Sequence, residues 1–298
     1  MIGFFFVFTA CLLWALDTLI RYPLVQGQIS AVSIVFIEHL LLTIIFSVVF
    51  ARSVKRLVYI KKKDLISFVI VGGIGSALAT VAFTKAFSYL NPSLVILLQK
   101  FQPVVAIVLA RLVLRERVQL PFAFWAMVCL FGALLIGYED MIVVSNAENL
   151  NDLVYRNAGI GYALVAFSVL GWGAATVFGK RLLEQGYKHE QVLAGRFFTG
   201  LIFLTPFMLT EQSILNYSIE IFGKISLMVF VSGLLAMYLY YNGLKKMSAR
   251  ACSLTELFFP FFAVIVNWIY LDATLSVYQI AGGLILILGS VVIQMKRL

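Results

Sequence analysis

Residues Phe83–Leu114 read FTKAFSYLNPSLVILLQKFQPVVAIVLARLVL, and residues Tyr240–Leu271 read YYNGLKKMSARACSLTELFFPFFAVIVNWIYL. The two stretches align without a gap at a shift of 157 residues, which places Pro260 on Pro103, and the match continues as far as Ile293. Few residues are identical, but the hydropathy rises and falls in step, and each proline lies inside an apolar segment. A duplicated and almost wholly apolar chain is typical of a membrane transporter built from two related halves.

The composition supports a membrane protein. The chain has 298 residues, of which 62% are hydrophobic and 12% charged, and its mean hydropathy is +1.00. A soluble domain carries roughly 25% charged residues, so much of this surface must face lipid. The net charge of +9 comes from short loops between apolar segments, which favours membrane orientation over nucleic-acid binding. With two histidines, and three cysteines that lack ligand spacing, we expect neither a metal site nor a cofactor (Cys11, Cys129, Cys252).

Ten segments are apolar and long enough to cross a bilayer, which requires about 20 residues each. In order they are Ile2–Tyr22, Ser30–Ala51, Leu65–Leu90, Pro92–Leu112, Leu120–Tyr138, Ala158–Leu183, Gln191–Leu209, Phe222–Lys245, Ala249–Leu271 and Ser276–Gln294. The longest polar gap, residues 139–157, is acidic and separates the fifth segment from the sixth. We therefore expect two five-helix repeats, 1–138 and 158–298, joined by an acidic extracytoplasmic linker.

The positive charges predict the orientation. Sixteen of the 23 Lys and Arg residues fall on the side that carries both termini, and three fall on the other side (Arg21, Arg156, Lys224). Because cytoplasmic loops are enriched in Lys and Arg, we expect both termini in the cytoplasm of a prokaryotic cell with the protein in its cytoplasmic (inner) membrane. An odd number of spans in each half makes the second half inverted, which is the geometric basis of alternating access. The alternative is that the duplication only helped to build a stable bundle.

Several motifs together indicate a family. They are the small-aromatic run Phe83–Leu90, Asn91-Pro92-Ser93, the run Gln99–Pro103, Leu114–Arg117, Leu254–Ala263, the set Gln279, Gly282, Gly283 and Gly289, and Trp14 and Trp172. This pattern resembles the EamA type of the drug/metabolite transporter superfamily. The resemblance implies ten helices, cytoplasmic termini, and a central cavity lined mainly by helices 1, 3, 4, 6, 8 and 9. It also implies a substrate among amino acids, nucleotide conjugates, other metabolites or drugs.

The polar residues inside the fourth and ninth segments are the first candidates for substrate binding. An ionisable side chain at the bilayer centre costs at least ~2.5–3.5 kcal/mol, so it needs a partner or a wet cavity. Lys100 lies between Gln99 and Gln102, and Pro103 frees a backbone carbonyl one turn earlier. We expect a substrate-binding wall here, with a polar contact between helices as the alternative. In the second half, Glu256 occupies the position equivalent to Gln99. Its expected role is that of a counter-charge to Lys100, a ligand for a substrate amine, or a proton carrier.

Six further residues complete the candidate set: Trp14, Asp17, Lys85, Trp172, Tyr241 and Asn242. The two tryptophans occupy equivalent places in the two halves, where they either flank a substrate or pack between helices. Lys85 either faces the cavity or snorkels outward, and its match Asn242, with Tyr240 and Tyr241 beside it, is a further candidate for the cavity wall. Asp17 is four residues from Arg21, so a helical ion pair is the simplest interpretation, and substrate or proton handling is the alternative. Glu38 and His39 lie opposite Arg196 by the repeat, where pairing or a gate is expected.

Nucleotide-binding and catalytic motifs are absent from the sequence, so we expect a transporter and not an enzyme. The predicted function is secondary transport, with export of an amino acid or related metabolite, and a proton or cation is a possible coupling partner. The alternatives are a multidrug or cationic-compound exporter, and a membrane enzyme or assembly factor. We expect the lipid bilayer and a small-molecule substrate as partners, no nucleic acid, and a monomer or homodimer.

Overall fold

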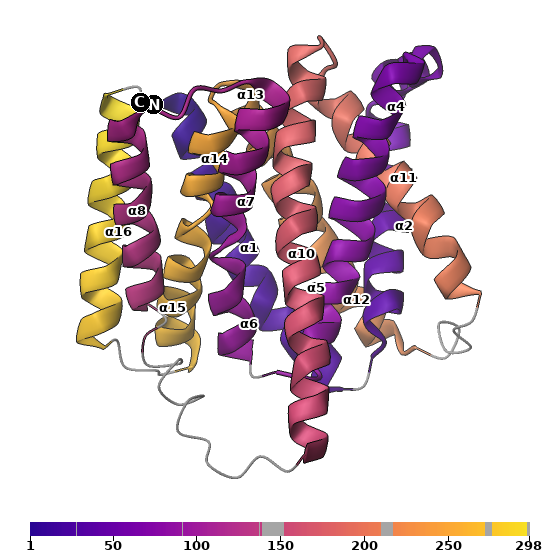
Figure 1. The fold of residues 1–298 in the computed structure, drawn as a ribbon. Helices are drawn as coiled ribbons and strands as arrows, with labels where there is room; N and C mark the ends of the chain where they lie inside the picture. Colours follow the sequence, from indigo (N-terminus) through magenta and orange to yellow (C-terminus); the bar gives the residue numbers. More distant parts are fainter. Residues whose placement is uncertain are drawn as a thin grey trace.

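The computed structural model describes residues 1–27, 29–90, 92–136, 138, 152–209, 217–271 and 276–296. Within these ranges the chain is all-helical (Figure 1), and ten helical segments follow the ten predicted spans in order. They are α1 (Ile2–Gln26), α2 (Ala31–Val49), α4–η2–α5 (Lys62–Phe68, Val69–Leu78, Ala79–Ala86), α6–α7–η3 (Pro92–Gln99, Gln102–Leu109, Ala110–Leu114), α8 (Leu120–Ile136), α10 (Asp152–Glu184), α11 (His189–Met208), α12–η5–α13 (Ile219–Met228, Val229–Ala236, Met237–Lys245), α14–α15 (Ala249–Thr255, Phe258–Leu271) and α16 (Val277–Met295). Short α3 (Ala51–Val54) and η1 (Lys55–Tyr59) connect α2 to α4.

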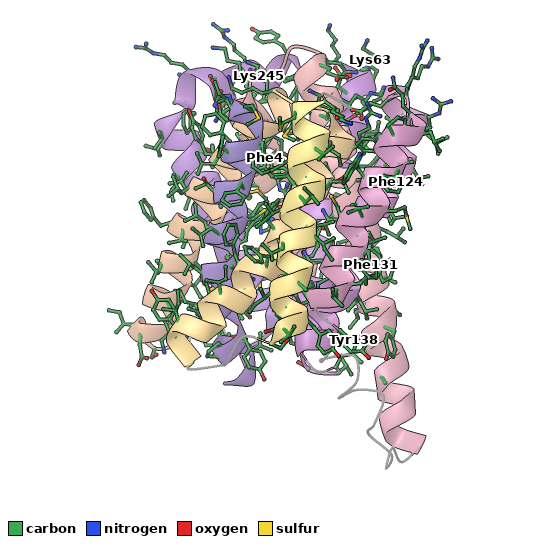
Figure 2. The ribbon with its side chains drawn as sticks, turned by 90° about the vertical axis from the view of Figure 1, so that its left-hand side faces the viewer. Phe4, Lys63, Phe124, Phe131, Tyr138 and Lys245 are labelled. Carbon is green, nitrogen blue, oxygen red and sulfur yellow. The ribbon has the colours of Figure 1, made fainter. Side chains whose placement is uncertain are left out.

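The outer surface of the bundle suits lipid. Six of the segments are long and apolar enough to span a membrane by themselves. Phe124 and Phe131 are more than half exposed on α8. Figure 2 shows them along the side of the bundle, with Lys63 and Lys245 at one end. This is the end where α1 begins and α16 ends (Figure 1), and we call it the termini end.

Two irregularities recur at matching places of the two halves. The fourth segment is broken between α6 and α7, and the ninth is broken between α14 and α15. The third and eighth segments each contain a wider π-helical stretch, η2 and η5, and shifting η2 by the repeat places it over most of η5. The helical repeat therefore extends to departures from regular helix, which are frequent at functional sites.

Several segment boundaries differ from those predicted by a few residues, and two of these differences lie near the cavity and the linker. Helix α1 continues one turn beyond Tyr22 to Gln26, with Pro23 inside its last turn. Helix α10 begins at Asp152, so the last six residues of the predicted linker are helical, while residues 139–151 lie outside the described residues. Polarity had suggested a loop over 152–157, but a helix that satisfies its own backbone hydrogen bonds can continue beyond its apolar part.

Helices α8 and α16 lie side by side at one edge of the bundle in both views (Figures 1 and 2). They approach closely because each has a glycine at the crossing. A Cβ on Gly132 would lie 2.8 Å from the carbonyl oxygen of Gly282, and a Cβ on Gly282 would lie 2.6 Å from that of Gly132. Small residues allow such backbone contact between helices in membranes.

Candidate solute-binding cavity

A cavity of about 210 Å³ lies in the centre of the bundle. It extends from Tyr240 and Glu256, nearer the termini end, to Tyr22, Phe87 and Ile96 near the opposite ends of their helices. The lining helices include the six that the family resemblance implies. The second and seventh segments also contribute, through Glu38, His39, Leu42, Arg196 and Phe197.

The two helix breaks place polar side chains in the cavity wall. Lys100 and Phe101 form a turn before Pro103, and Glu256 and Leu257 form a turn before Pro260. Proline lacks the N–H of a helical hydrogen bond, and its ring collides with the carbonyl four residues earlier, so each helix tightens or breaks one turn before its proline. The sequence predicted kinks at Pro103 and Pro260, and both prolines line the cavity. Interrupted helices at corresponding places of two repeats are a strong indication of a binding site.

Glu256 is the centre of the first polar network. Its Oε2 accepts a 2.5 Å hydrogen bond from Gln102 Nε2, and its Oε1 accepts from the Tyr240 hydroxyl at 3.0 Å and the Thr176 hydroxyl at 3.3 Å. Thr176 and Tyr240 also contact each other at 2.9 Å. The network joins both broken helices to α10 and α13, so the two halves meet at this carboxylate.

Gln99 and Lys100 occupy the end of α6. Lys100 is buried, and its Nζ donates to the carbonyl of Ala133 in α8 at 2.7 Å. Gln99 lines the cavity, and its Oε1 is buried without a hydrogen-bond donor among the described residues. An unmatched buried acceptor is costly, by about 1–3 kcal/mol, so a rotation of the Gln99 amide that turns Oε1 into the cavity would be favoured by a ligand N–H.

Aromatic rings form the apolar part of the wall. Trp14 pairs with Tyr240, with ring centroids 5.4 Å apart, and Phe83 pairs with Trp172 at 4.8 Å. The two tryptophans come from the first helix of each half, so each half contributes one tryptophan, and each tryptophan pairs with a ring of the other half. Both residues line the cavity and are only partly buried.

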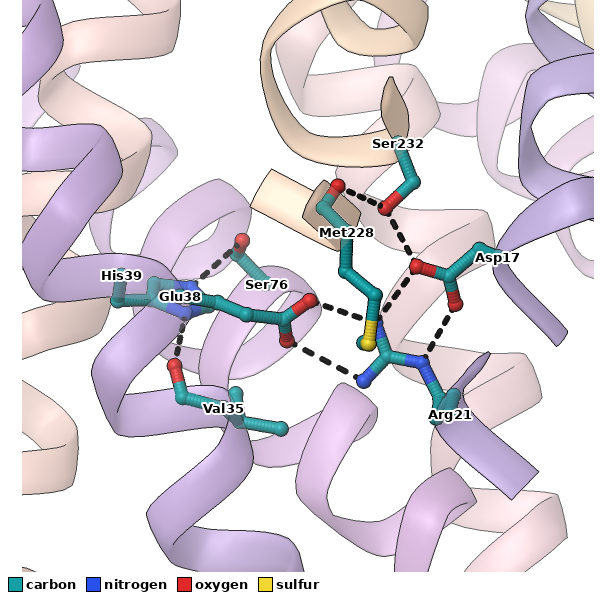
Figure 3. Close-up of polar contacts among 8 residues, drawn as sticks. All are labelled: Asp17, Arg21, Val35, Glu38, His39, Ser76, Met228 and Ser232. Carbon is teal, nitrogen blue, oxygen red and sulfur yellow. Dashed lines mark hydrogen bonds and ion pairs between the residues drawn. The ribbon is translucent and has the colours of Figure 1, made fainter. Parts of the chain in front are cut away.

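A second polar cluster, which we call the Asp17 cluster, consists of Asp17, Arg21, Glu38 and Ser232 (Figure 3). The Arg21 guanidinium donates to Asp17 through Nε at 2.7 Å and to Glu38 through a terminal nitrogen at 2.7 Å. Ser232 in η5 lies 2.6 Å from Asp17 Oδ1. All four residues are at least nine-tenths buried and line the cavity. The predicted helical pair of Asp17 and Arg21 is therefore present, and it shares its guanidinium with Glu38.

A third group links Arg196 to His39 through Ser76 of η2. Arg196 Nε donates to Ser76 Oγ at 2.9 Å, and Ser76 Oγ lies 3.0 Å from His39 Nε2. His39 Nδ1 lies 2.8 Å from the carbonyl oxygen of Val35. The predicted pairing of the second and seventh helices thus runs through His39 and a serine, while Glu38 pairs with Arg21 instead. The repeat predicted correctly that the second and seventh helices pair. It did not predict which of the neighbouring residues Glu38 and His39 would lie on the side of Arg196.

Most of the predicted site residues meet at the cavity, and three do not. Trp14, Asp17, Gln99, Lys100, Gln102, Trp172 and Glu256 line it. Lys85 is exposed in the last turn of α5. Tyr241 is fully buried and accepts a hydrogen bond from Arg196, and Asn242 donates to the carbonyl of Tyr238 in its own helix. Successive residues are rotated by about 100° around the helix axis. An equivalent position in the repeat therefore does not decide whether a side chain points into the cavity.

Sequence reasoning missed Arg21, Thr176 and Ser232 as cavity residues. Arg21 had been counted with the outer segment because it stands in the last turn of the predicted first span, whereas α1 continues to Gln26. Its spacing of four from Asp17 predicted the ion pair but not that the pair lines the cavity. Thr176 and Ser232 carry no comparable signal, because hydroxyl residues are common in membrane helices.

Paired helix breaks around a polar cavity, within two related helical halves, define a multi-pass integral membrane transporter. The sequence matches the EamA-like transporter family over residues 1–138 and 159–295, and the chain belongs to that family. It is 30% identical over 302 residues to a protein named riboflavin transporter ImpX from Fusobacterium nucleatum, covering 98% of this chain and 97% of the relative. It is also 24% identical to an uncharacterized transporter from Archaeoglobus fulgidus, with 95% of each chain covered.

A further relative is the uncharacterized transporter YyaM of Bacillus subtilis, at 23% identity over 76% of this chain and 72% of the relative. One solved crystal structure superposes with a TM-score of 0.72, covering 97% of this chain and 95% of that chain. Its sequence identity is 17%, so it supports the helical arrangement alone.

Proposed function

We propose that this protein is a secondary transporter that works by alternating access, and that its solute is a flat heteroaromatic compound of the riboflavin class. The observation that carries the proposal is the cavity wall, in which two aromatic pairs lie near amide and carboxylate groups. Flat rings pack well against aromatic side chains, and a few placed polar groups fix the orientation of a ligand. The relative named as a riboflavin transporter, which matches this chain almost end to end, supports the same class.

The polar groups also favour a flat heterocycle over an amino acid. A zwitterion requires paired opposite charges that are free to bind it. In the cavity, Arg21 already holds Asp17 and Glu38. Hydrogen bonds with neutral side chains occupy two further charged groups of the wall, Glu256 and Arg196. The unmatched Oε1 of Gln99 instead suits a neutral N–H donor, such as the ring imide of a flavin. The export of amino acids, which the charge balance had suggested, thus becomes the second candidate.

Counterflow in liposomes tests the proposed solute. Purified protein should exchange labelled external riboflavin for unlabelled internal riboflavin, well above protein-free vesicles. Flavin analogues should compete and amino acids should not. Lys100→Ala and Glu256→Gln should each abolish the exchange, while a cooperative thermal unfolding transition shows that both variants remain folded. Competition by one class of amino acids would favour the second candidate, and broad competition among unrelated cations would favour a multidrug exporter.

We further propose that the termini end faces the cytoplasm of a prokaryotic inner membrane, as the positive charges favour. Cysteines introduced at Lys63, exposed near the termini end, and at Gly159, near the opposite end, test this orientation. A membrane-impermeant thiol reagent added to whole cells should label Gly159→Cys and leave Lys63→Cys unlabelled. The three native cysteines are buried and give a low background. The reverse pattern would invert the topology. Transport assays with riboflavin placed inside or outside the vesicles would give the direction of transport, and export is expected.

A further inference from the structure

We propose that the Asp17 cluster is a proton-binding site that couples transport to a proton gradient, with Asp17 Oδ1 as the atom that takes the proton. The inference rests on the proposed function for its solute, but the site itself is argued from the cluster's own geometry. The charge of the cluster indicates one proton, and the hydrogen count indicates Asp17 as the group that takes it.

The charge of the cluster is the first argument. Two carboxylates share one guanidinium, so the cluster carries one net negative charge when all three groups are ionised. A buried net charge in a membrane protein is costly, and a single proton removes it. A metal cation suits the site less well, because the carboxylate oxygens already face the guanidinium of Arg21 and a second cation would lie beside it.

The hydrogen count is the second argument. The Ser232 hydroxyl has one proton and lies within hydrogen-bond distance of two acceptors, Asp17 Oδ1 at 2.6 Å and the Met228 carbonyl oxygen at 2.9 Å (Figure 3). It can donate fully to only one of them. With Asp17 ionised, Ser232 donates to the carboxylate, and the short contact suits such a charge-assisted bond. With Asp17 protonated, the new O–H donates to Ser232 Oγ, and Ser232 donates to Met228. Both acceptors are then satisfied.

The proton step follows from this arrangement. A proton from water in the cavity bonds to Asp17 Oδ1, the hydrogen bond to Ser232 reverses its direction, and the net charge of the cluster goes from minus one to zero. Two Arg21 nitrogens reach both oxygens of each carboxylate, at 2.7 and 3.3 Å on Asp17 and at 2.7 and 3.2 Å on Glu38. What distinguishes Asp17 is the hydroxyl of Ser232, which can reverse the direction of its hydrogen bond. Ser232 lies in η5, so the proton changes the contact between α1 and the eighth segment. This links protonation to the packing of one half against the other.

Other titratable or charged groups on the packed elements have partners or lie apart. His39 has both ring nitrogens in contact, with Val35 and Ser76, and Arg196 donates to Ser76. Glu256 and Tyr240 belong to the network nearer the termini end. Four further groups are exposed (Lys85, Glu220, Lys224, Lys245), and Arg250 lies 3.6 Å from Glu116 at the termini end.

Infrared difference spectra between alkaline and mildly acidic pH, above the range in which exposed carboxylates take protons, test the site without a solute. The wild type should gain the carbonyl stretch of buried protonated carboxylic acid, and Asp17→Asn should lose one component of that band. Ser232→Ala should keep the band but shift its frequency, because the acid loses its hydrogen-bond acceptor. Glu220→Gln, on the exposed face of α12, should behave as the wild type. A band of full size in Asp17→Asn would overturn the proposal.

Transport tests the coupling. In liposomes, an imposed pH gradient of one polarity should drive wild-type accumulation of riboflavin, and Asp17→Asn should lose this accumulation to a greater extent than it loses exchange. Accumulation driven by sodium, or pH-driven accumulation that survives in Asp17→Asn, would contradict the proposal. If the wild type exchanges no riboflavin at all, the proposed solute fails, whereas the infrared result on Asp17 stands separately.

Discussion

At the residue scale, the cavity holds its carboxylates in two different ways. Asp17 and Glu38 are held by one guanidinium, which provides charge compensation. Glu256 is held by neutral donors from Gln102, Thr176 and Tyr240. A carboxylate has about four lone-pair positions and accepts all three bonds. Glu256 therefore orients three side chains from three different segments, and the shape of the cavity near the termini end depends on it.

Glu256→Gln is expected to disrupt this arrangement with little change in volume. An amide presents one oxygen and one NH₂ group. The Gln102 amide can flip and accept from that NH₂ group, but Thr176 and Tyr240 lose a charged acceptor, which costs about 1.5–3 kcal/mol locally. Counterflow should fall to the background of protein-free vesicles, while a cooperative unfolding transition shows that the variant remains folded. Glu220→Gln is the matched control, and wild-type exchange in Glu256→Gln would remove Glu256 from the site.

Sequence alone located most of these residues, because an ionisable group in an apolar segment is conspicuous. Lys100, Asp17 and Glu256 were found this way, and all three line the cavity. The pairings between side chains of different helices were harder to predict. The pairing of Glu38 with Arg21, and of His39 with Ser76, depends on how α1, α2 and η2 pack, and hydropathy does not encode that packing.

At the element scale, glycine and proline have different tasks in this bundle. Pro103 and Pro260 interrupt helices at the cavity, where freed backbone groups and polar side chains can meet water or solute. Gly132 and Gly282 sit where α8 and α16 cross at the edge of the bundle, outside the cavity lining. The sequence predicted both prolines as kinks, but it did not predict complete breaks or the π-helical η2 and η5. Those depend on contacts with other helices.

Gly132→Val is expected to separate α8 from α16. Its side chain would meet the Gly282 carbonyl oxygen and the Leu286 nitrogen, each 2.8 Å from the position of a Cβ. Both are backbone atoms that cannot rotate away, so the substitution should cost about 1–3 kcal/mol. Thermal unfolding in detergent should show a lower midpoint. Gly223→Val is the control, because nothing lies within 4 Å of a Cβ there. Equal midpoints for both variants would contradict this account of the crossing.

At the scale of the whole molecule, a contact made by Glu116 joins the two halves at the termini end. Glu116, in the loop after η3 of the first half, accepts hydrogen bonds from the backbone nitrogens of Ala249 at 2.8 Å and Arg250 at 3.3 Å. The Arg250 guanidinium also lies 4.3 Å from the ring centroid of Phe122. A carboxylate at the first turn of a helix is stabilised by the free backbone N–H groups and by the helix dipole. The contact therefore fastens one half to the other.

The residues at the equivalent positions of the repeat, at the opposite end, cannot form the contact that Glu116 makes with the first turn of α14. By sequence, Ala273 corresponds to Glu116, and Pro92 corresponds to Ala249. Alanine has no carboxylate, and proline has no N–H to donate. Two inverted halves that exchange conformations would otherwise favour the two open states equally, so Glu116 should bias the protein toward the state that is closed at the termini end.

Glu116→Gln should weaken this bias. Loss of a charged acceptor costs roughly 1.5–3 kcal/mol, which corresponds to about a tenfold or greater increase in the ratio of molecules open at the termini end to those closed there. Cys252, fully buried in α14 three residues after Ala249, reports this opening. In a background with Cys11 and Cys129 replaced by alanine, its labelling by a thiol reagent should become faster in Glu116→Gln and stay slow in Glu220→Gln. Labelling of Glu116→Gln at the wild-type rate would mean that the apolar packing around Cys252, and not the Glu116 contact, keeps this end closed.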